Sequence, residues 1–184
     1  WKGTYYTFSI TWEGEEREVM DPYAKAAGVN GDRAMVVDLT ETNPAGWEQD
    51  THVMPEHPTD AVIWEVHVRD FSWDSYSGMK NKGQYLAFTE KGTHIPGHPK
   101  LPTGVEYLKQ LGITHVHLMP CFDFYTVDET RGKKDLYNWG YDPQNYNVPE
   151  GSYSTDPYHG EVRIREMKKM IQALHQAGIG VIMD

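Results

Sequence analysis

The chain has a single cysteine, Cys121, and an excess of acidic over basic residues. One cysteine allows neither an internal disulfide nor a cysteine-based zinc cluster, so we expect Cys121 to be a small buried hydrophobic residue. The 17 Lys and Arg against 27 Asp and Glu give a net charge of -10. This charge repels phosphate backbones and anionic lipid headgroups, which excludes nucleic acid as an expected partner and favours neutral or cationic ligands.

The sequence also lacks any apolar run near the roughly 18 residues that a membrane span needs, so no membrane partner is expected. It begins at Trp1 without an initiator Met or a leader, and we expect the natural N-terminus to lie further upstream. Localisation stays open, with secretion or the cell surface slightly favoured over the cytoplasm. What the chain does contain, 39% hydrophobic and 12% aromatic residues in 184, suffices for a packed core.

The first third of the chain has the pattern of β structure. Residues 5–12, YYTFSITW, alternate with the period of two that is typical of a half-buried strand. One face of this strand would carry Tyr6, Phe8, Ile10 and Trp12. A second strand is predicted over residues 33–39. Because two or three strands cannot close a sandwich, residues 1–45 are predicted to be the trailing part of a β-sandwich module, and the proline-rich residues 46–60 a linker.

From residue 61 on, strands and helices alternate. Strands are predicted over residues 61–68 and 113–120 and in the final GVIMD. A helix that opens with a Thr103–Glu106 capping box and ends at Gly112 lies between the first two strands, and a second helix over residues 161–177 precedes the third. This β-α-β-α-β order predicts parallel strands with right-handed crossovers.

Two connections, residues 70–102 and 121–158, are much longer than a structureless loop inside a domain normally is. In a barrel of parallel strands, the loops after the strand C-termini form the active face. The second connection contains LYNWGYDPQNY, residues 136–146, in which glycine and proline argue against a core strand or helix. Its aromatic rings with nearby Asn and Asp suit a neutral sugar, and the alternative is an aromatic loop that packs on itself.

Residues 137–143, YNWGYDP, followed by YNVPEGSYSTDP, closely resemble the signature of type I pullulanases, debranching members of the α-amylase family of glycoside hydrolases. VIWEVHVRDFS resembles that family's first barrel strand, LKQLGITHVHLMP its first helix and second strand, and GEVRIREMKKMIQALHQAGIGVIMD its second helix and third strand. Upstream, DPYAKA resembles the end of a family forty-eight carbohydrate-binding module. Isoamylases share the Trp-Gly-Tyr-Asp-Pro core, and Asn138 with the VPEGSYS continuation favours pullulanase.

The resemblance implies hydrolysis of α-1,6 branch linkages in pullulan, starch or glycogen with retention of configuration, which needs two carboxyl groups about 5 to 5.5 Å apart. In the family these groups follow strands four and five, whereas this chain stops at Asp184, after strand three. We therefore expect residues 61–184 to form an incomplete (β/α)8 TIM barrel of three β/α units. The chain would have no catalytic residue and no activity alone. Its partners would be an α-glucan and the remainder of the catalytic domain, in the same or another chain.

The resemblance also implies roles for individual residues. Tyr141 would be the platform under a sugar ring, or else a structural aromatic. Asp142 would bond either a sugar hydroxyl or the loop backbone. Trp139 and Asn138 would shape the loop more than touch the sugar. Asp184 would be a framework carboxylate near the active face rather than a catalyst.

Other polar residues are given structural interpretations. His67, His115 and His117 lie near strand ends and are read as polar residues of a barrel interior that pair with Glu65 or the backbone, rather than as metal ligands. No cofactor is expected. The charged loop over residues 123–135 lacks the calcium-loop pattern, and calcium, which occurs in parts of the family, is left open. The second helix is expected to expose one charged face: Glu161, Arg163, Arg165, Glu166, Lys168 and Lys169.

Three hypotheses follow. The first is a part of a pullulanase-type enzyme. The second is a non-catalytic α-glucan-binding protein that keeps the aromatic loop. The third is a small three-layer α/β protein unrelated to sugars.

Overall fold

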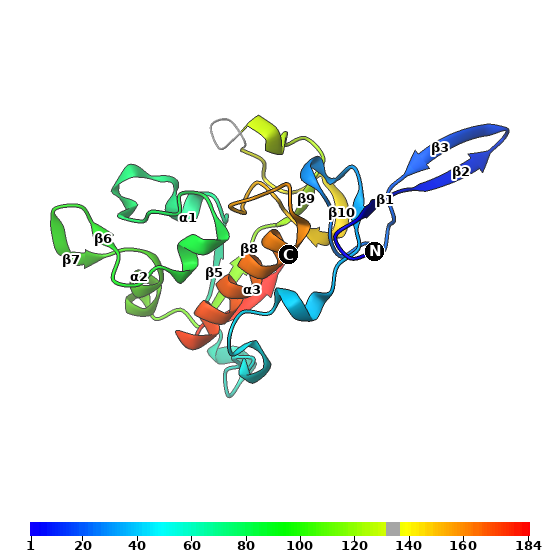
Figure 1. The fold of residues 1–184 in the computed structure, drawn as a ribbon. Coiled ribbons are helices and arrows are strands. Elements are labelled where there is room, and N and C mark those ends of the chain that lie inside the picture. Colours follow the sequence, from blue (N-terminus) through cyan, green and yellow to red (C-terminus); the bar gives the residue numbers. More distant parts are fainter. Residues whose placement is uncertain (132–136) are drawn as a thin grey trace. The chain divides into compact units, whose positions relative to one another are not determined.

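A computed structural model describes residues 1–131 and 137–184. It is a mixed α/β structure, and its contacts divide the chain into two compact units (Figure 1). Residues 1–42 and 122–164 form the first unit, and residues 43–121 and 165–184 form the second. These compact units are not the predicted domains. The domain boundaries at residues 45 and 60 stay a prediction.

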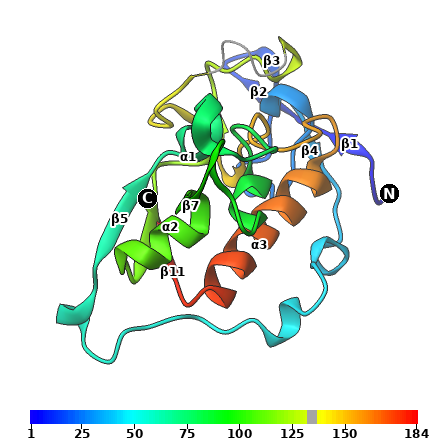
Figure 2. The ribbon, with the colours of Figure 1, turned by 90° about the vertical axis from the view of Figure 1, so that its left-hand side faces the viewer.

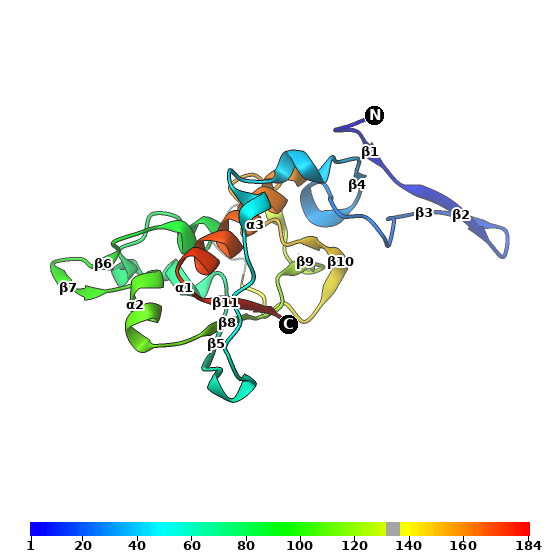
Figure 3. The same cartoon turned by 90° about the horizontal axis from the view of Figure 1, so that it is seen from below.

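The second unit is built on a three-stranded parallel sheet, as the alternating pattern predicted. Its strands are β5 (Ile63–Val66), β8 (His115–Leu118) and β11 (Gly180–Met183), in the order β11-β8-β5. The three strands lie side by side in Figure 3, with β8 between its two neighbours. The aligned register sets His115 beside Ile63 and His117 beside Glu65, so each pair shares one face of the sheet.

Helix α2 (Gly104–Leu111) precedes β8, and α3 (Gly160–Gln176), which begins in the first unit, precedes β11 (Figure 2). Large apolar side chains of the helices and strands, with Ile179 just before β11, form the core of the second unit: Leu108, Val116, Leu118, Met170, Leu174 and Ile179. The face of the sheet that carries Ile63 is less covered by the described residues, since Ile63 is 54% exposed.

The helix ends differ in part from the prediction. Gly112 ends α2 in the left-handed conformation, with its N–H bonded to the carbonyls of Leu108 and Lys109, as expected. The prediction of a capping box was wrong, because the Thr103 hydroxyl does not cap α2 and instead donates to the carbonyl of Ser77. Gly178 beyond α3 also has a positive φ, 77°.

The charged face predicted for α3 was wrong at two positions. Arg163 is completely buried and Glu166 is 5% exposed, although Lys169 is exposed as expected. A hydrophobic period marks which face packs on a core, but it treats every charged residue as solvated. Burial of Arg163 depends on partners that lie elsewhere in the chain.

The long connections contain local structure of their own. Between β5 and α2 lie α1 (Asp70–Trp73), β6 (His94–Ile95) and β7 (His98–Pro102), and between β8 and α3 lie β9 (Phe122–Phe124) and β10 (Pro143–Pro149). Along the whole described part of the chain, the 3-10 helices are η1 (Val29–Gly31), η2 (Leu39–Thr42), η3 (Trp47–Gln49), η4 (Pro58–Asp60), η5 (Ser75–Ser77), η6 (Tyr85–Thr89) and η7 (Glu129–Arg131). Cys121, after β8, is buried as predicted.

Three antiparallel strand pairs are seen among the described residues of the first unit. These are β1 (Tyr5–Tyr6) with β4 (Ala34–Met35), β2 (Phe8–Trp12) with β3 (Glu15–Val19), and β9 with β10. A small core of Ala24, Ala27, Ala34 and Val148 joins the N-terminal segment to β10. Residues 1–42 and 122–164 therefore pack together although they are far apart in the sequence.

The prediction of one half-buried strand over residues 5–12 was wrong. The predicted strand is interrupted at Thr7. Its second part, β2, forms an exposed hairpin with β3, a strand that was not predicted (Figure 1). Phe8, Ile10 and Trp12 share a face, as the period of two requires, yet all three are exposed, although the Tyr6 ring meets the Phe8 ring edge to face. The strand predicted over residues 33–39 is reduced to Ala34–Met35.

The segment predicted to be a linker is attached to α3 within the second unit. His175 pairs with Asp50 over 2.6 Å, and Gln172 donates over 3.1 Å to the carbonyl of Ala45, the residue directly before the segment. Of the helices that the structure describes, none combines the length and apolar character needed to cross a bilayer.

Candidate functional site

The aromatic loop, residues 137–143, leads into β10 in the first unit. Residues 132–136, including Leu136 at the start of the predicted motif, lie outside the described residues. Tyr141 is 62% exposed and Trp139 is 60% exposed. The Trp139 ring meets the Tyr137 ring edge to face, with 6.0 Å between the centroids. The loop therefore displays most of its aromatic surface rather than burying it, which favours the displayed over the self-packed interpretation.

Polar side chains of the same loop face inward and hold it. Asn138 accepts from the Gly140 N–H over 2.7 Å and donates to the Thr126 hydroxyl over 2.8 Å. Asp142 accepts from the Thr126 hydroxyl over 2.5 Å and from the Thr126 N–H over 3.2 Å. Thr126 thus bridges the two ends of the loop, and Gly140, with φ 96°, allows the turn between them.

The geometry bears on the predicted residue roles to different degrees. Asp142 accepts from the backbone N–H of Thr126, outside the aromatic loop, and its Oδ1 is buried without a hydrogen bond from any described residue. Asn138 shapes the loop. Contact of Tyr141, Trp139 or Asp142 with sugar stays a prediction. Asp184 belongs to the other compact unit, where its N–H donates to Leu118, and its role as a framework carboxylate also stays a prediction.

A buried ionic cluster lies in the same unit. Arg163, in the first turn of α3, donates to Asp123 over 2.7 Å and to Glu129 over 2.9 Å, and none of the three side chains is more than 2% exposed. The guanidinium also donates to three backbone carbonyls, those of Gly28, Pro149 and Pro157. One side chain therefore ties together segments from both ends of the unit.

Glu150, directly after β10, completes the cluster. Its two carboxylate oxygens accept from the N–H groups of Phe124 and Ser152, over 2.7 Å and 2.8 Å. Burial, together with the nearby Glu129 and Asp123 carboxylates, raises the pKa of Glu150 to about 8. Burial also raises the pKa of Asp123, against the opposing effect of Arg163. Glu150 is therefore protonated at neutral pH, which limits the negative charge around the single guanidinium.

The carboxyl oxygens of Asp123, Glu129 and Glu150 lie within 4.8 Å of one another. That spacing resembles the separation needed in a retaining glycosidase and also suits a metal ion. Neither use fits this cluster, because Arg163 already supplies the cation and burial prevents a sugar from reaching the acids. We interpret the cluster as the structural centre of the unit that carries the aromatic loop.

The histidines of the sheet follow the structural interpretation where contacts are seen. His117 Nδ1 lies 3.8 Å from Glu65, the predicted partner, and His115 Nδ1 lies 2.7 Å from the Thr114 hydroxyl. The absence of a cofactor and the open question of calcium stay predictions.

Sequence reasoning missed Arg163 and its three acidic partners. The sequence offers only a weak signal for them, an arginine beside Ile164 at the start of an amphipathic helix. The acids come from positions 40, 34 and 13 residues earlier in the chain. No local pattern predicts their convergence.

Comparison with known proteins gives the context for this site. The family model for the catalytic domain of α-amylase matches residues 102–184. A pullulanase of Bacillus subtilis (strain 168) is 44% identical over 99% of this chain and 24% of its own length. The solved pullulanase from Bacillus acidopullulyticus superposes with a TM-score of 0.94 at 54% identity, over 100% of this chain and 22% of that one.

A pullulanase from Paenibacillus barengoltzii, solved in complex with maltohexaose and α-cyclodextrin, has a TM-score of 0.94 and 51% identity over 98% of this chain and 28% of its own. The chain thus spans about a quarter of the length of these relatives. Residues 102–184 are thus similar to the α-amylase family of glycoside hydrolases. Within that family the similarity covers the whole chain and is to part of a type I pullulanase.

Proposed function

We propose that this chain is part of a debranching enzyme that hydrolyses α-1,6 linkages in pullulan, starch or glycogen with retention of configuration. Residues 137–143 supply part of the face that holds the glucan, and the catalytic carboxyl groups lie outside residues 1–184. The observation that carries the proposal is the exposure of Tyr141. This residue is 62% exposed, and it lies on a loop whose shape is held by hydrogen bonds of Asn138 and Asp142. A ring held in this way stacks on a sugar with little loss of conformational freedom.

The likeness to pullulanases supports the substrate class. The relative solved with maltohexaose and α-cyclodextrin is 51% identical to this chain. The net charge of -10 agrees with a neutral polysaccharide as ligand. The carboxyl groups gathered around Arg163 are buried, and Asp123 and Glu129 are ion-paired with it, so they are not proposed as the catalytic pair.

We also propose that residues 61–184 are the first three β/α units of a TIM barrel, that residues 1–45 end a β-sandwich module, and that residues 46–60 join them. The parallel order of β5, β8 and β11 supports the first part. The partly uncovered face of that sheet supports the remainder of the catalytic domain as a partner, because an open barrel sheet exposes apolar surface.

The test uses the natural gene product that contains residues 1–184, at its full length. We expect it to release reducing sugar from pullulan, whereas residues 1–184 alone release none. Tyr141→Ala should lower kcat/KM on pullulan about tenfold, which corresponds to about 1.4 kcal/mol of lost binding. Tyr141→Phe keeps the ring and should stay close to the parent, and Tyr23→Ala, at an exposed tyrosine of the same unit, is the control.

Binding of maltotriose without any hydrolysis would instead support the second hypothesis, a non-catalytic α-glucan-binding protein. Unchanged kcat/KM in Tyr141→Ala would remove this ring from the site.

A further inference from the structure

His175, in the last turn of α3, is held through one of its two ring nitrogens. Its Nδ1 lies 2.6 Å from Asp50 Oδ2, and 9% of the His175 side chain and 13% of the Asp50 side chain are exposed. A carboxylate oxygen accepts hydrogen bonds, so the Nδ1–H of His175 donates to Asp50. In the neutral imidazole, Nε2 then carries a lone pair, which can accept a hydrogen bond or bind a metal ion.

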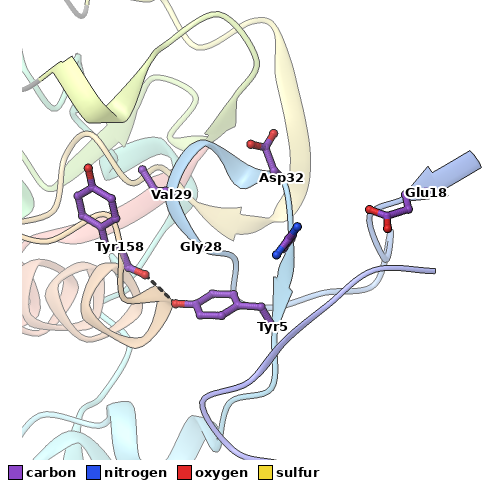
Figure 4. A pocket seen from close by; sticks show the side chains of 7 residues that line it. Tyr5, Glu18, Gly28, Val29, Asp32 and Tyr158 are labelled. Carbon is purple, nitrogen blue, oxygen red and sulfur yellow. Dashed lines mark hydrogen bonds between the residues drawn. The ribbon is translucent and has the colours of Figure 1, made fainter. Parts of the chain in front are cut away.

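The Nε2 atom of His175 is buried, and it has no hydrogen-bond partner among the described residues. A bond between distant segments of the first unit shows the contrast. There the Tyr5 hydroxyl donates its one hydrogen to the carbonyl of Tyr158 over 2.7 Å (Figure 4). His175 makes a similar long-range bond through Nδ1, but its second nitrogen is left over. Since most buried polar atoms in proteins have a partner, this nitrogen points to a ligand.

A second imidazole, that of His52, lies against His175. The two ring centroids are 5.9 Å apart, and the ring planes make an angle of 79°. Two imidazoles on one tetrahedral zinc ion have their centroids about 5 Å apart, because each Zn–N bond is about 2.0 to 2.1 Å long. His52 is exposed and makes no hydrogen bond with another described residue, so its ring is free to turn and to move by the small remaining distance.

The Asp50 carboxylate prepares His175 for this use. Histidines that bind a metal almost always donate their other ring N–H to a carboxylate, a carbonyl or a water, which fixes the ring and makes the ligating nitrogen more basic. Asp50 and His52 lie two residues apart, in the segment that follows η3, whereas His175 lies 123 residues beyond His52. An ion bound by both histidines would therefore join residues 46–60 to the end of α3.

We propose that His52 and His175 bind a divalent transition-metal ion such as Zn²⁺, with Asp50 as the residue that orients His175. Imidazole nitrogens suit Zn²⁺, Cu²⁺ and Ni²⁺, whereas Ca²⁺ and Mg²⁺ take oxygen ligands. Water completes the coordination of the ion. The bound ion fastens residues 46–60 to α3, and it suppresses local opening of that segment in proportion to its occupancy.

Hydrogen exchange of the natural full-length gene product, read by mass spectrometry, tests the site locally. Zn²⁺ at ten times its dissociation constant should slow exchange in residues 50–54 about tenfold, because the ion binds only the closed segment. Residues 8–19, the β2–β3 hairpin of the first unit, are the internal control and should not change. Ca²⁺ is the control ion and should have no effect on residues 50–54.

His52→Ala tests the ligand without disturbing the core, since His52 is exposed. Calorimetric titration with Zn²⁺ should show a dissociation constant at least tenfold higher for this site than in the parent. His57→Ala, at an exposed histidine of the same segment, is the matched control and should bind as the parent does. The melting temperatures of both variants, measured without metal, should equal that of the parent.

Asp50→Asn tests the orienting role, because the amide oxygen still accepts from His175 Nδ1 but carries no charge. The dissociation constant for Zn²⁺ should rise about tenfold, as is usual when the partner of a metal-binding histidine is changed. Asp60→Asn, at an exposed acid of η4, should leave it unchanged. An unchanged dissociation constant in Asp50→Asn would overturn the role of Asp50.

Equal binding of Zn²⁺ by the parent and by His52→Ala would mean that the ion binds elsewhere, and it would overturn the site. Exchange in residues 50–54 that does not respond to Zn²⁺ would overturn it as well. None of these measurements depends on hydrolysis of pullulan, so the metal site and the proposed function stand or fall separately.

Discussion

Arg163 in the first turn of α3 donates to Asp123 in β9 over 2.7 Å, with both side chains shielded from solvent. The same guanidinium reaches Glu129 in η7 over 2.9 Å. The Arg163 guanidinium allows the unit to bury Asp123 and Glu129, whose charges would otherwise repel one another. Both acids belong to the connection that also carries the aromatic loop.

Arg163→Met should destabilise the protein by about 3 to 5 kcal/mol, because it leaves buried carboxylates without their cation. The free energy of unfolding, measured in urea, reports the effect. Lys169→Met makes the same kind of change at an exposed position of α3 and should cost less than about 0.5 kcal/mol. A loss below about 1 kcal/mol for Arg163→Met would show that the cluster contributes little.

Glu150 should make stability depend on pH. Its pKa is about 8 in the folded protein against 4.5 for a solvated glutamate, so at a pH between these values unfolding releases a proton. The free energy of unfolding should therefore fall as pH rises from about 4.5 to about 8 and become level above that. The contribution of this group has an upper limit of roughly 5 kcal/mol.

The matched variant for that pH dependence is Glu150→Gln, which cannot ionise. The amide of the variant can accept from only one of the two N–H groups that Glu150 bonds, so we expect a constant loss of about 1 to 2 kcal/mol at every pH. The decisive quantity is the slope of unfolding free energy against pH between about 5 and 8, which should be smaller in Glu150→Gln. Parallel slopes in the two proteins would show that Glu150 ionises normally when folded.

The parallel strands, the connecting helices and the turn at Gly112 were predictable, because period and helix-ending glycines are local properties of the sequence. The exposure of β2 and the burial of Arg163 were not predictable, because burial depends on which other residues pack against a side chain. The alternation of Phe8, Ile10 and Trp12 predicted a shared face correctly, yet nothing local indicates whether that face is covered. For Arg163 the partners come from distant segments, so the helix pattern placed it on the wrong face.

The aromatic loop was predictable in composition but not in construction. Trp139 and Tyr141 could be expected to be exposed because Gly140 and Pro143 make a regular core element unfavourable. The bridging residue, Thr126, lies 12 residues before Asn138, and residues 132–136 between them lie outside the described part of the chain. No sequence pattern marks a threonine for this role.

Thr126→Val should loosen the loop without unfolding the protein. The variant keeps the shape of Thr126 but removes the hydroxyl that joins Asn138 to Asp142. We expect maltotriose to bind about fivefold more weakly, as one hydrogen bond of order 1 kcal/mol is lost from the loop framework. Calorimetric titration of the natural full-length gene product measures this. Thr126→Ser restores the hydroxyl and should recover binding, and equal affinity in all three proteins would remove Thr126 from the framework.

Alanine substitutions at Gly31 and Gly14 distinguish the cost of backbone strain from the cost of crowding at the ionic cluster. Both have positive φ, 66° and 82°. An added Cβ at Gly31 would come within 2.0 Å of Asp123 Oδ2, whereas at Gly14 it would meet nothing within 4 Å. Gly14→Ala should therefore cost about 1 kcal/mol from strain alone. Gly31→Ala should cost about 3 kcal/mol or more, because it also pushes Asp123 away from Arg163. Unfolding in urea measures both, and equal costs would mean that the cluster tolerates a shift of Asp123.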